Sequence, residues 1–352
     1  MSGAEADIRI RREGAVGRIT LTRPKALNAL TPAMCLAMEQ ALRDWAEDDA
    51  VTLAIVDAEG GKAFCAGGDV AEMCRRGRAG DTAFARAFFQ DEYRLNRMIG
   101  DFPKPYVALM DGIVMGGGVG ISAHGSHRIV TERTMMAMPE CAIGMIPDVG
   151  GTHLLGAAPG RTGEYLGMTG ARMDAADAIF AGFADVMVPA DRLADLVAAL
   201  TSRADPVVIA DFTQAPGDSA LAALQPAVEA VFSGESAVAT RAALAAESAD
   251  WATKALSQMD HGSPLSVVMT QTLVRAARAA PGLVEALMRE FRFAAQASEH
   301  ADFLEGVRAA LIDKDRSPKW THADLAAVPA ELVAKLSAPD ALGELDFTPP
   351  KG

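Results

Sequence analysis

The sequence is poor in several features that mark particular classes of protein. It has four cysteines among 352 residues, with no C-x-x-C pair and no Cys/His spacing suited to tetrahedral zinc, which argues against a disulfide scaffold and a zinc site. Aromatic residues make up 5%, and 33 lysines and arginines face 46 aspartates and glutamates, for a net charge of −13. A chain this negative lacks the basic surface that binds nucleic acid or anionic membranes nonspecifically, so we expect neither partner.

Long apolar runs and targeting signals are also missing. No segment approaches the roughly 18 uninterrupted apolar residues of a membrane-spanning helix. The first residues, MSGAEADIRIRREG, contain no apolar run of signal-peptide length, and their acidic residues argue against a transit peptide. We therefore expect a cytoplasmic protein with reduced thiols and without a membrane partner.

What is present is an apolar half, 50% of the residues, arranged first in an α/β pattern. Residues 7 to 22 alternate as a β-hairpin does, and the short apolar runs at 52 to 57 and 106 to 110 are typical of strands covered on both faces. A helix is predicted from Thr31 and Pro32 to about Glu47, because Thr suits the N-cap and Pro the first turn. These segments predict an α/β body over residues 1 to 204.

The later part of the chain is alanine-rich and helical in pattern. Residues 205 to 219, with two prolines and a glycine, form the best candidate boundary. Beyond it, helices are predicted to begin at Ser263 with Pro264, after Pro281, and at Asp302. We therefore expect a helical region over residues 205 to 352.

One candidate site segment, AFCAGGD at residues 63 to 69, follows the predicted strand at 52 to 57. Consecutive small residues let backbone N–H groups approach a ligand closely and bind a developing negative charge. The same residues could instead form only a tight turn, with Asp69 capping the next helix.

A second segment, MGGGVG at residues 115 to 120, has four glycines in five positions at the entry to a predicted helix. Each glycine costs up to ~1 kcal/mol relative to alanine inside an element, so bare backbone is needed there. A dinucleotide fingerprint would need a longer helix than Gly125 allows, and a nucleophile elbow around Ser122 has His124 where glycine is required. The third possibility is that N–H groups at the helix N-terminus bind negative charge.

A third segment, residues 138 to 151, carries Glu140 and Asp148 among Pro, Gly and apolar residues. Such surroundings disfavour ionisation, and carboxylates with perturbed pKa values cluster at functional sites. Either carboxylate alone could merely cap or begin a helix. Two donor segments and two such carboxylates together favour a catalytic site.

These segments, with TRPKALNAL at 22 to 30, KPYVALMDGIVMGGGVG at 104 to 120 and MPECAIGMIPDVGG at 138 to 151, resemble the crotonase superfamily. The resemblance implies an α/β fold, a spiral of ββα units followed by a helical region that packs on its own core or on neighbouring subunits, which leaves a homo-oligomer open. It also implies that two backbone N–H groups stabilise an acyl-thioester oxyanion. By motif position these donors would belong to Ala66 and Gly117.

Within the superfamily, two departures separate the chain from the enoyl-CoA hydratases. Hydratases carry a second glutamate where this chain has Gly120, and they tend to have glycine where it has Asp148. The segment FFQDEY at 88 to 93 and DKDRSPKW at 313 to 320 instead look like the 3-hydroxyisobutyryl-CoA hydrolase branch, which implies hydrolysis of a short branched 3-hydroxyacyl-CoA in valine degradation. The alternatives are an enoyl-CoA hydratase or isomerase and, from another class, a non-catalytic acyl-CoA-binding protein.

The resemblance also implies roles for individual residues. Glu140 would be the nucleophile or a general base on water, Asp148 would orient the substrate or handle the proton of the leaving thiolate, and Glu92 would bind the 3-hydroxyl group. The remaining residues expected at the acyl-CoA site are Gly67, Gly68, Asp69 and Gly116, together with Arg23 and Lys25, which could bind the CoA phosphates or be solvated loop charges. No metal or cofactor is expected, because coenzyme A is part of the substrate.

Overall fold

The computed structural model describes residues 7–339 and 343–349. The chain divides into two compact units, of which the first comprises Met1–Gly68, Arg94–Met136 and Met173–Ala220. The second comprises Asp69–Tyr93, Ala137–Arg172 and Leu221–Gly352. The boundary at residue 204 that the sequence suggests for domains stays a prediction.

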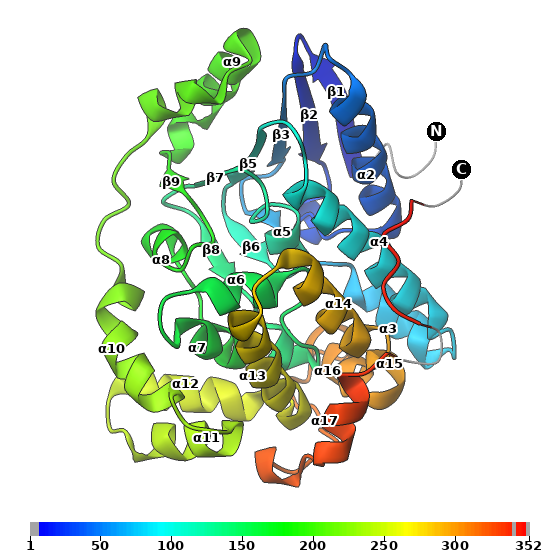
Figure 1. Cartoon of the computed structure of the whole chain (residues 1–352), viewed down its shortest axis with the longest axis vertical. Coiled ribbons are helices and arrows are strands. Elements are labelled where there is room, and N and C mark those ends of the chain that lie inside the picture. The colour runs from blue at the N-terminus through cyan, green and yellow to red at the C-terminus, as the bar shows by residue number, and fades with distance from the viewer. Residues whose placement is uncertain (1–6, 340–342, 350–352) are drawn as a thin grey trace. The chain divides into compact units, whose positions relative to one another are not determined.

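The strands of the described residues form a six-stranded and a three-stranded sheet (Figure 1). They are β1 (Ile8–Glu13), β2 (Val16–Leu21), β3 (Leu53–Ala58), β4 (Ala63–Cys65), β5 (Tyr106–Met110), β6 (Ile113–Met115), β7 (His127–Val130), β8 (Met135–Ala137) and β9 (Val186–Met187). The large sheet has the order β1-β2-β3-β5-β7-β9, with β1 and β2 antiparallel and the other pairs parallel, and the small sheet has the order β4-β6-β8. From β3 onward, successive strands thus alternate between the two sheets, as in the spiral of ββα units that the resemblance implies.

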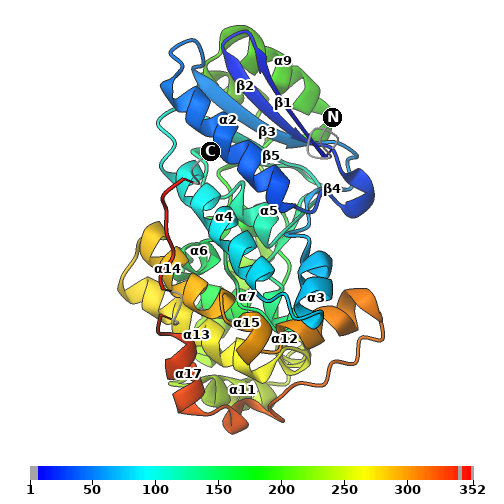
Figure 2. The ribbon, with the colours of Figure 1, turned by 90° about the vertical axis from the view of Figure 1, so that its right-hand side faces the viewer.

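Helices of the first unit cover both faces of the large sheet (Figure 2). Helix α2 (Pro32–Glu47) lies on one face, where a Cβ on Gly17 would be 2.5 Å from the Trp45 ring, so glycine is required for this close packing. Helix α9 (Leu193–Arg203) packs Leu196 and Leu200 on the other face, against a core of aliphatic strand residues. The first unit also contains α5 (Gly117–Gly120), α8 (Ala175–Phe180) and the short helices η1 (Pro24–Ala26), η3 (Ala190–Arg192) and η4 (Pro206–Phe212).

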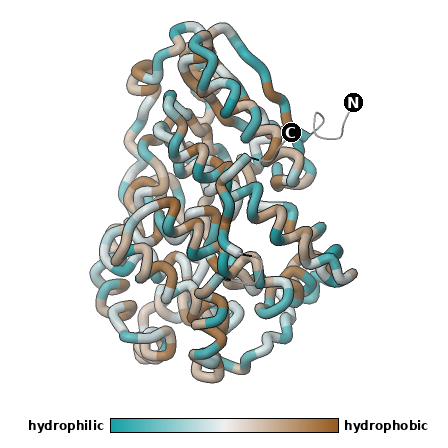
Figure 3. Tube along the Cα trace, turned by 45° about the vertical axis from the view of Figure 1, so that its right-hand side comes forward, coloured by the Kyte–Doolittle hydropathy of each residue, from teal (hydrophilic) through white to brown (hydrophobic). Residues whose placement is uncertain are grey.

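The second unit is built from helices, and apolar and polar stretches alternate along them (Figure 3). They are α3 (Val70–Arg78), α6 (Gly151–Ala157), α7 (Thr162–Thr169), α10 (Ala220–Phe232), α11 (Ala237–Ala246), α12 (Asp250–His261), α13 (Pro264–Ala279), α14 (Leu283–Ala294), α15 (Ala297–His300), α16 (Phe303–Val307) and α17 (Ala330–Leu336), with the short turns η2 (Glu140–Ile143), η5 (Arg308–Ile312) and η6 (Leu325–Ala327). Helix α4 (Ala83–Gly100) begins in the second unit and ends in the first. No helix of the described residues is long and apolar enough to cross a bilayer.

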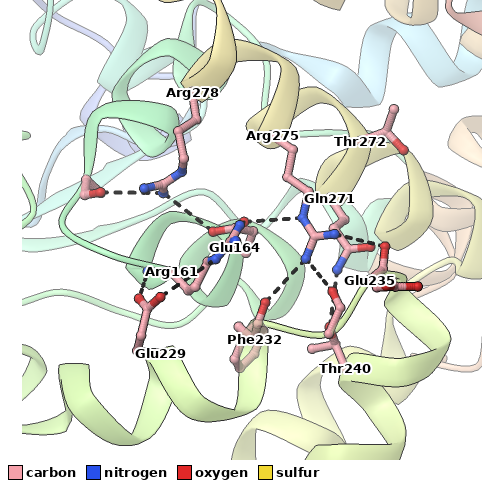
Figure 4. A network of polar contacts seen from close by, with 12 residues as sticks. Arg161, Glu164, Glu229, Phe232, Glu235, Thr240, Gln271, Thr272, Arg275 and Arg278 are labelled. Carbon is pink, nitrogen blue, oxygen red and sulfur yellow. Dashed lines mark hydrogen bonds and ion pairs between the residues drawn. The ribbon is translucent and has the colours of Figure 1, made fainter.

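A buried carboxylate joins several helices of the second unit (Figure 4). The Glu164 side chain is fully buried and forms ion pairs with Arg161 at 2.7 Å, Arg275 at 3.4 Å and Arg278 at 3.5 Å. Arg275 also donates to the carbonyl oxygens of Phe232 and Gly234 at the end of α10. Glu164 is thus satisfied by structural partners on α13 and beside α7.

Most elements begin where the sequence predicts. The hairpin and the strands near residues 53 and 106 are confirmed, and the Thr31 and Ser263 side chains accept capping hydrogen bonds from the backbone. Asp69 stands at the N-cap of α3, but its side chain makes no capping hydrogen bond there. The helix expected from Asp302 to near Ile312 is present, as α16 followed directly by a π-helical turn, Arg308–Ile312.

Candidate active site

The two glycine-rich segments meet at the small sheet of the first unit. Strands β4 and β6 are parallel neighbours, so the segments that follow them leave the sheet side by side. A Cβ on Gly67, whose φ is +111°, would lie 3.4 Å from the carbonyl oxygen of Met115 and 3.7 Å from the nitrogen of Gly117. A Cβ on Gly118 would lie 2.2 Å from the carbonyl oxygen of Cys65. Gly118 is therefore required by the close approach of the two backbone segments, and Gly67 by its positive φ.

The hydrogen bonds of the first glycine-rich segment show that one of the two expected oxyanion donors, Ala66, is wrong. The Ala66 N–H donates to the Leu27 carbonyl at 3.0 Å, so it is already engaged and the assignment of Ala66 as an oxyanion donor is not supported. The Gly67 carbonyl accepts from the Leu30 N–H at 2.9 Å. In the trans peptide between Gly67 and Gly68, the Gly68 N–H points opposite to the Gly67 carbonyl. It therefore points away from Leu30.

Gly116 and Gly117 lie at the start of α5. Gly116 is its N-cap, and Gly117 is its first residue. The N–H groups of a helix's first turn have no acceptor within the helix, so Gly117 presents a donor at this end. Together with the direction found for Gly68, this makes the N–H groups of Gly68 and Gly117 the candidate pair of donors.

The loop before α2 holds the first glycine-rich segment in place. Leu27 and Asn28 both adopt left-handed backbone conformations, with φ of 51° and 56°. The buried Asn28 amide donates to the Ala63 carbonyl at 2.9 Å, at the start of β4. The segment that accepts the Ala66 N–H is therefore itself anchored to β4.

The two expected phosphate-binding cations differ in their surroundings. The Arg23 guanidinium donates to the Ala29 carbonyl at 2.5 Å and lies 3.5 Å from the Asp7 carboxylate, so it is engaged within the protein. Lys25 is exposed within η1. In residues 7–339 and 343–349, no group of three or more His, Cys, Asp or Glu side chains is arranged to hold a metal ion.

The second unit gathers the three carboxylates expected from the sequence. Glu92 on α4 is 2% exposed, and Glu140 at the start of η2 and Asp148 before α6 are each 6% exposed. The Tyr93 hydroxyl donates to Asp148 Oδ2 at 2.6 Å. The charge of Asp148 influences both glutamates. These residues therefore form one buried acidic cluster, which we define as Glu92, Glu140 and Asp148.

The cluster holds protons at a pH where exposed carboxyls have lost them. Burial, followed by the charge of Asp148, raises the pKa values of Glu92 and Glu140 well above their usual range. Burial raises the pKa of Asp148 to about 7, although the hydrogen bond from Tyr93 opposes the rise. Groups with this range of proton affinities can act as acid and base near neutral pH.

Two oxygens of the cluster lack hydrogen-bond partners. Within the part of the chain that the structure describes, Glu92 Oε1 and Glu140 Oε2 are buried and bonded to nothing. Buried polar atoms are nearly always satisfied, so such atoms at a candidate site indicate where a ligand or water donates a hydrogen bond.

Sequence reasoning missed two contributors to this region. Tyr93 follows Glu92 in the FFQDEY segment, and its position could have been noticed there. Glu290 on α14 accepts from the N–H of Gly150 at 2.7 Å and from the N–H and hydroxyl of Thr152 at 2.8 and 2.5 Å. Nothing near Glu290 in the sequence marks it, because its partners lie about 140 residues earlier.

A family model, related sequences and solved structures each match most of this chain. The family model for enoyl-CoA hydratase/isomerase matches residues 16–336. The mitochondrial 3-hydroxyisobutyryl-CoA hydrolase of Gallus gallus is 39% identical, over 97% of this chain and 91% of its own length. 3-Hydroxyisobutyryl-CoA hydrolase 1 of Arabidopsis thaliana is 37% identical, over 90% of this chain and 87% of its own length.

Solved structures agree on the fold but carry other activities in their names. An enoyl-CoA hydratase from Rhodobacter sphaeroides 2.4.1 matches with a TM-score of 0.92 and 50% identity, over 97% of this chain and all of that chain. A carnitinyl-CoA dehydratase from Mycobacterium thermoresistibile matches with a TM-score of 0.93 and 42% identity, over 97% of this chain and 98% of that chain. The chain thus belongs to the enoyl-CoA hydratase/isomerase family, the crotonase superfamily, and is an acyl-CoA enzyme with the crotonase fold.

Proposed function

We propose that this enzyme hydrolyses a short branched 3-hydroxyacyl-CoA thioester, 3-hydroxyisobutyryl-CoA, to the free 3-hydroxy acid and CoA. The observation that carries the proposal is the pair of buried, unpartnered carboxyl oxygens, Glu92 Oε1 and Glu140 Oε2, in a cluster that retains protons. A hydroxylated acyl group supplies a donor for one of these oxygens, and the attacking water supplies a donor for the other. The curated relatives at 37–39% identity bear the name of this activity.

Backbone donors would stabilise the charge that develops on the thioester oxygen. We assign this role to the N–H groups of Gly68 and Gly117 in place of Ala66, whose N–H is engaged. Each such donor is worth roughly 3 to 4 kcal/mol in the transition state.

The carboxylates would supply the atoms and protons of hydrolysis. Glu140, once ionised, either removes a proton from a water that attacks the thioester carbon, or attacks that carbon itself to form an anhydride. In both routes a C–O bond forms as the C–S bond breaks, and in the second route water then cleaves the anhydride to release the acid and restore Glu140. Asp148 passes a proton to the leaving thiolate. Because Glu140 must lose its proton and its pKa is raised well above the usual range, the rising limb of the pH profile for thiol release should follow the ionisation of Glu140. Asp148 must keep its proton and has a pKa of about 7, so its ionisation should set the falling limb.

Hydration of an enoyl-CoA is the competing function, and the names of the solved relatives favour it. A hydratase of this family normally holds one water between two glutamates. This chain has a buried glycine, Gly120, at the position of the second glutamate. The loss of that side chain favours hydrolysis over hydration.

A thiol-release assay separates these functions. The purified protein is mixed in turn with 3-hydroxyisobutyryl-CoA and crotonyl-CoA, and free CoA is followed with a thiol reagent while alkene absorbance is recorded. The four cysteines of the protein are buried, so the reagent reports CoA. We expect rapid thiol release from the 3-hydroxyacyl thioester and little alkene loss.

The other outcomes point to other functions. Alkene loss from crotonyl-CoA without thiol release would establish a hydratase and overturn the proposal. Binding of both thioesters without turnover of either would indicate a non-catalytic acyl-CoA-binding protein.

A further inference from the structure

Glu290 on α14 is a buried glutamate whose side chain is held by backbone N–H and hydroxyl donors. Its side chain accepts three hydrogen bonds, one from Gly150 and two from Thr152, at 2.5 to 2.8 Å. Gly150 is the N-cap of α6 and Thr152 is the second residue of that helix. A glycine N-cap has no side chain to satisfy the first N–H groups of a helix, so Glu290 does so from another helix.

The turn that Glu290 holds is in an unfavourable backbone conformation. Val149 has a φ of +55°, and Gly150 follows with +79°. A left-handed conformation is rare for a β-branched residue and persists only where surrounding contacts enforce it. The Glu290 bond to the Gly150 N–H and the Gly151 N–H bond to the Asp148 carbonyl, at 2.6 Å, close this turn from both sides.

The residue that this turn carries is Asp148. Its carboxylate receives the Tyr93 hydroxyl at 2.6 Å and is the member of the acidic cluster whose charge influences the other two. If the Val149–Gly150 turn relaxed, the Asp148 backbone would rotate and its carboxylate would move relative to Tyr93. The direction of Asp148 therefore depends on contacts made two to four residues later.

We propose that Glu290 is a positioning residue that aims the Asp148 carboxylate by clamping the Val149–Gly150 turn at the start of α6. This inference rests on the proposed function, because it assigns a role in the same acidic cluster. In this role Glu290 acts on Asp148 through the backbone that follows it, because its hydrogen bonds go to Gly150 and Thr152.

The test uses Glu290→Gln. The glutamine amide has one accepting oxygen in place of two. Its NH2 group would face a backbone N–H that the second carboxylate oxygen accepts from in the wild type, so a hydrogen bond to the start of α6 is lost and two donors are brought together. A misplacement of about 1 Å in a catalytic group can cost roughly 100-fold in rate, so we expect kcat for thiol release to fall roughly 10- to 100-fold with KM changed less than about threefold. The matched control is Glu164→Gln, another fully buried glutamate of the same unit, for which we expect kcat within about twofold of wild type.

A double-mutant cycle separates positioning from a structural role. If Glu290 acts through Asp148, Glu290→Gln should reduce the residual kcat of an Asp148→Asn protein by less than about twofold, because the aimed group is already gone. The same 10- to 100-fold loss in that background, or an unchanged kcat in the single variant, would overturn the proposal.

A crystal structure of Glu290→Gln keeps this test independent of the proposed function. The Tyr93–Asp148 distance should lengthen beyond hydrogen-bonding range even if the wild-type enzyme proves to act on another acyl-CoA, and an unchanged distance would overturn the inference. Failure of wild type to release thiol from 3-hydroxyisobutyryl-CoA would contradict only the proposed substrate. If Glu290→Gln does not fold, Thr152→Val is used instead, because it removes only the hydroxyl donor. This variant should lower kcat by about two- to fivefold, and an unchanged kcat would contradict the proposal.

Discussion

Replacing Asp148 by asparagine should stabilise the fold at neutral pH while it impairs hydrolysis. Burial raises the pKa of the Asp148 carboxyl from 3.8 to about 7. Between these values the unfolded chain has lost the proton while the folded chain still holds it. Because the folded state then binds more protons, the free energy of unfolding decreases as the pH rises.

The magnitude follows from the size of the pKa shift. A rise of about three pKa units, at about 1.4 kcal/mol each, means that ionisable Asp148 costs the fold about 4 kcal/mol at pH 7 and less than about 1 kcal/mol at pH 4. Asparagine stays neutral at every pH, and its carbonyl oxygen still accepts from the Tyr93 hydroxyl. Asp148→Asn should therefore be more stable than wild type by an amount that grows from pH 4 to pH 7.

Denaturant unfolding at a series of pH values between 4 and 8, followed by circular dichroism, measures this difference. Asp101→Asn is the matched control, because Asp101 is exposed and forms a surface ion pair with Arg97. Its effect should stay within about 0.5 kcal/mol at each pH. A difference between Asp148→Asn and wild type that does not change with pH, or that shrinks as the pH rises, would refute the reasoning.

Three further substitutions give separate predictions. Gly118→Ala should destabilise the fold by about 1 to 3 kcal/mol in denaturant unfolding, because the added Cβ would lie 2.2 Å from a backbone oxygen beside β4; unchanged stability would contradict this close approach. Tyr93→Phe removes the donor that lowers the pKa of Asp148, the proposed proton donor, so the falling limb of the pH profile for thiol release should move upward by about one unit, and a downward shift would refute the assignment. Glu92→Gln should raise KM for 3-hydroxyisobutyryl-CoA about tenfold but leave KM for isobutyryl-CoA unchanged, and equal effects on both would show that Glu92 does not bind the 3-hydroxyl group.

The elements of the fold were predictable where their signals are local. Thr31 with Pro32 and Ser263 with Pro264 mark helix starts because capping involves only the next three residues, and each cap is present. The continuous apolar run at residues 52 to 57 identifies a strand because both faces of β3 are covered. Glu140 and Asp148 could be singled out because each stands among Pro, Gly and apolar residues, whereas Glu92 was indicated only by the resemblance of its segment, FFQDEY, to the family.

The parts that were not predictable depend on direction or on distant segments. Ala66 and Gly68 are both small residues in the same loop, and only the bonds to Leu27 and Leu30 show that the Ala66 N–H is engaged while the Gly68 N–H points away. Glu290 belongs to an ordinary amphipathic helix, and its importance comes from partners far away in the sequence. Spacing along a chain indicates which residues can meet, but not which way each backbone group points.

The proposal that Glu140 carries thioester hydrolysis is tested most directly by Glu140→Gln, with thiol release and substrate affinity measured on the same protein. We predict that kcat for 3-hydroxyisobutyryl-CoA falls by a factor of about 100 or more while the Kd of the thioester changes less than about threefold. Glu164→Gln, with its buried carboxylate outside the cluster, should retain wild-type turnover. Turnover by Glu140→Gln at the wild-type rate would contradict the assignment of hydrolysis to the buried acidic cluster.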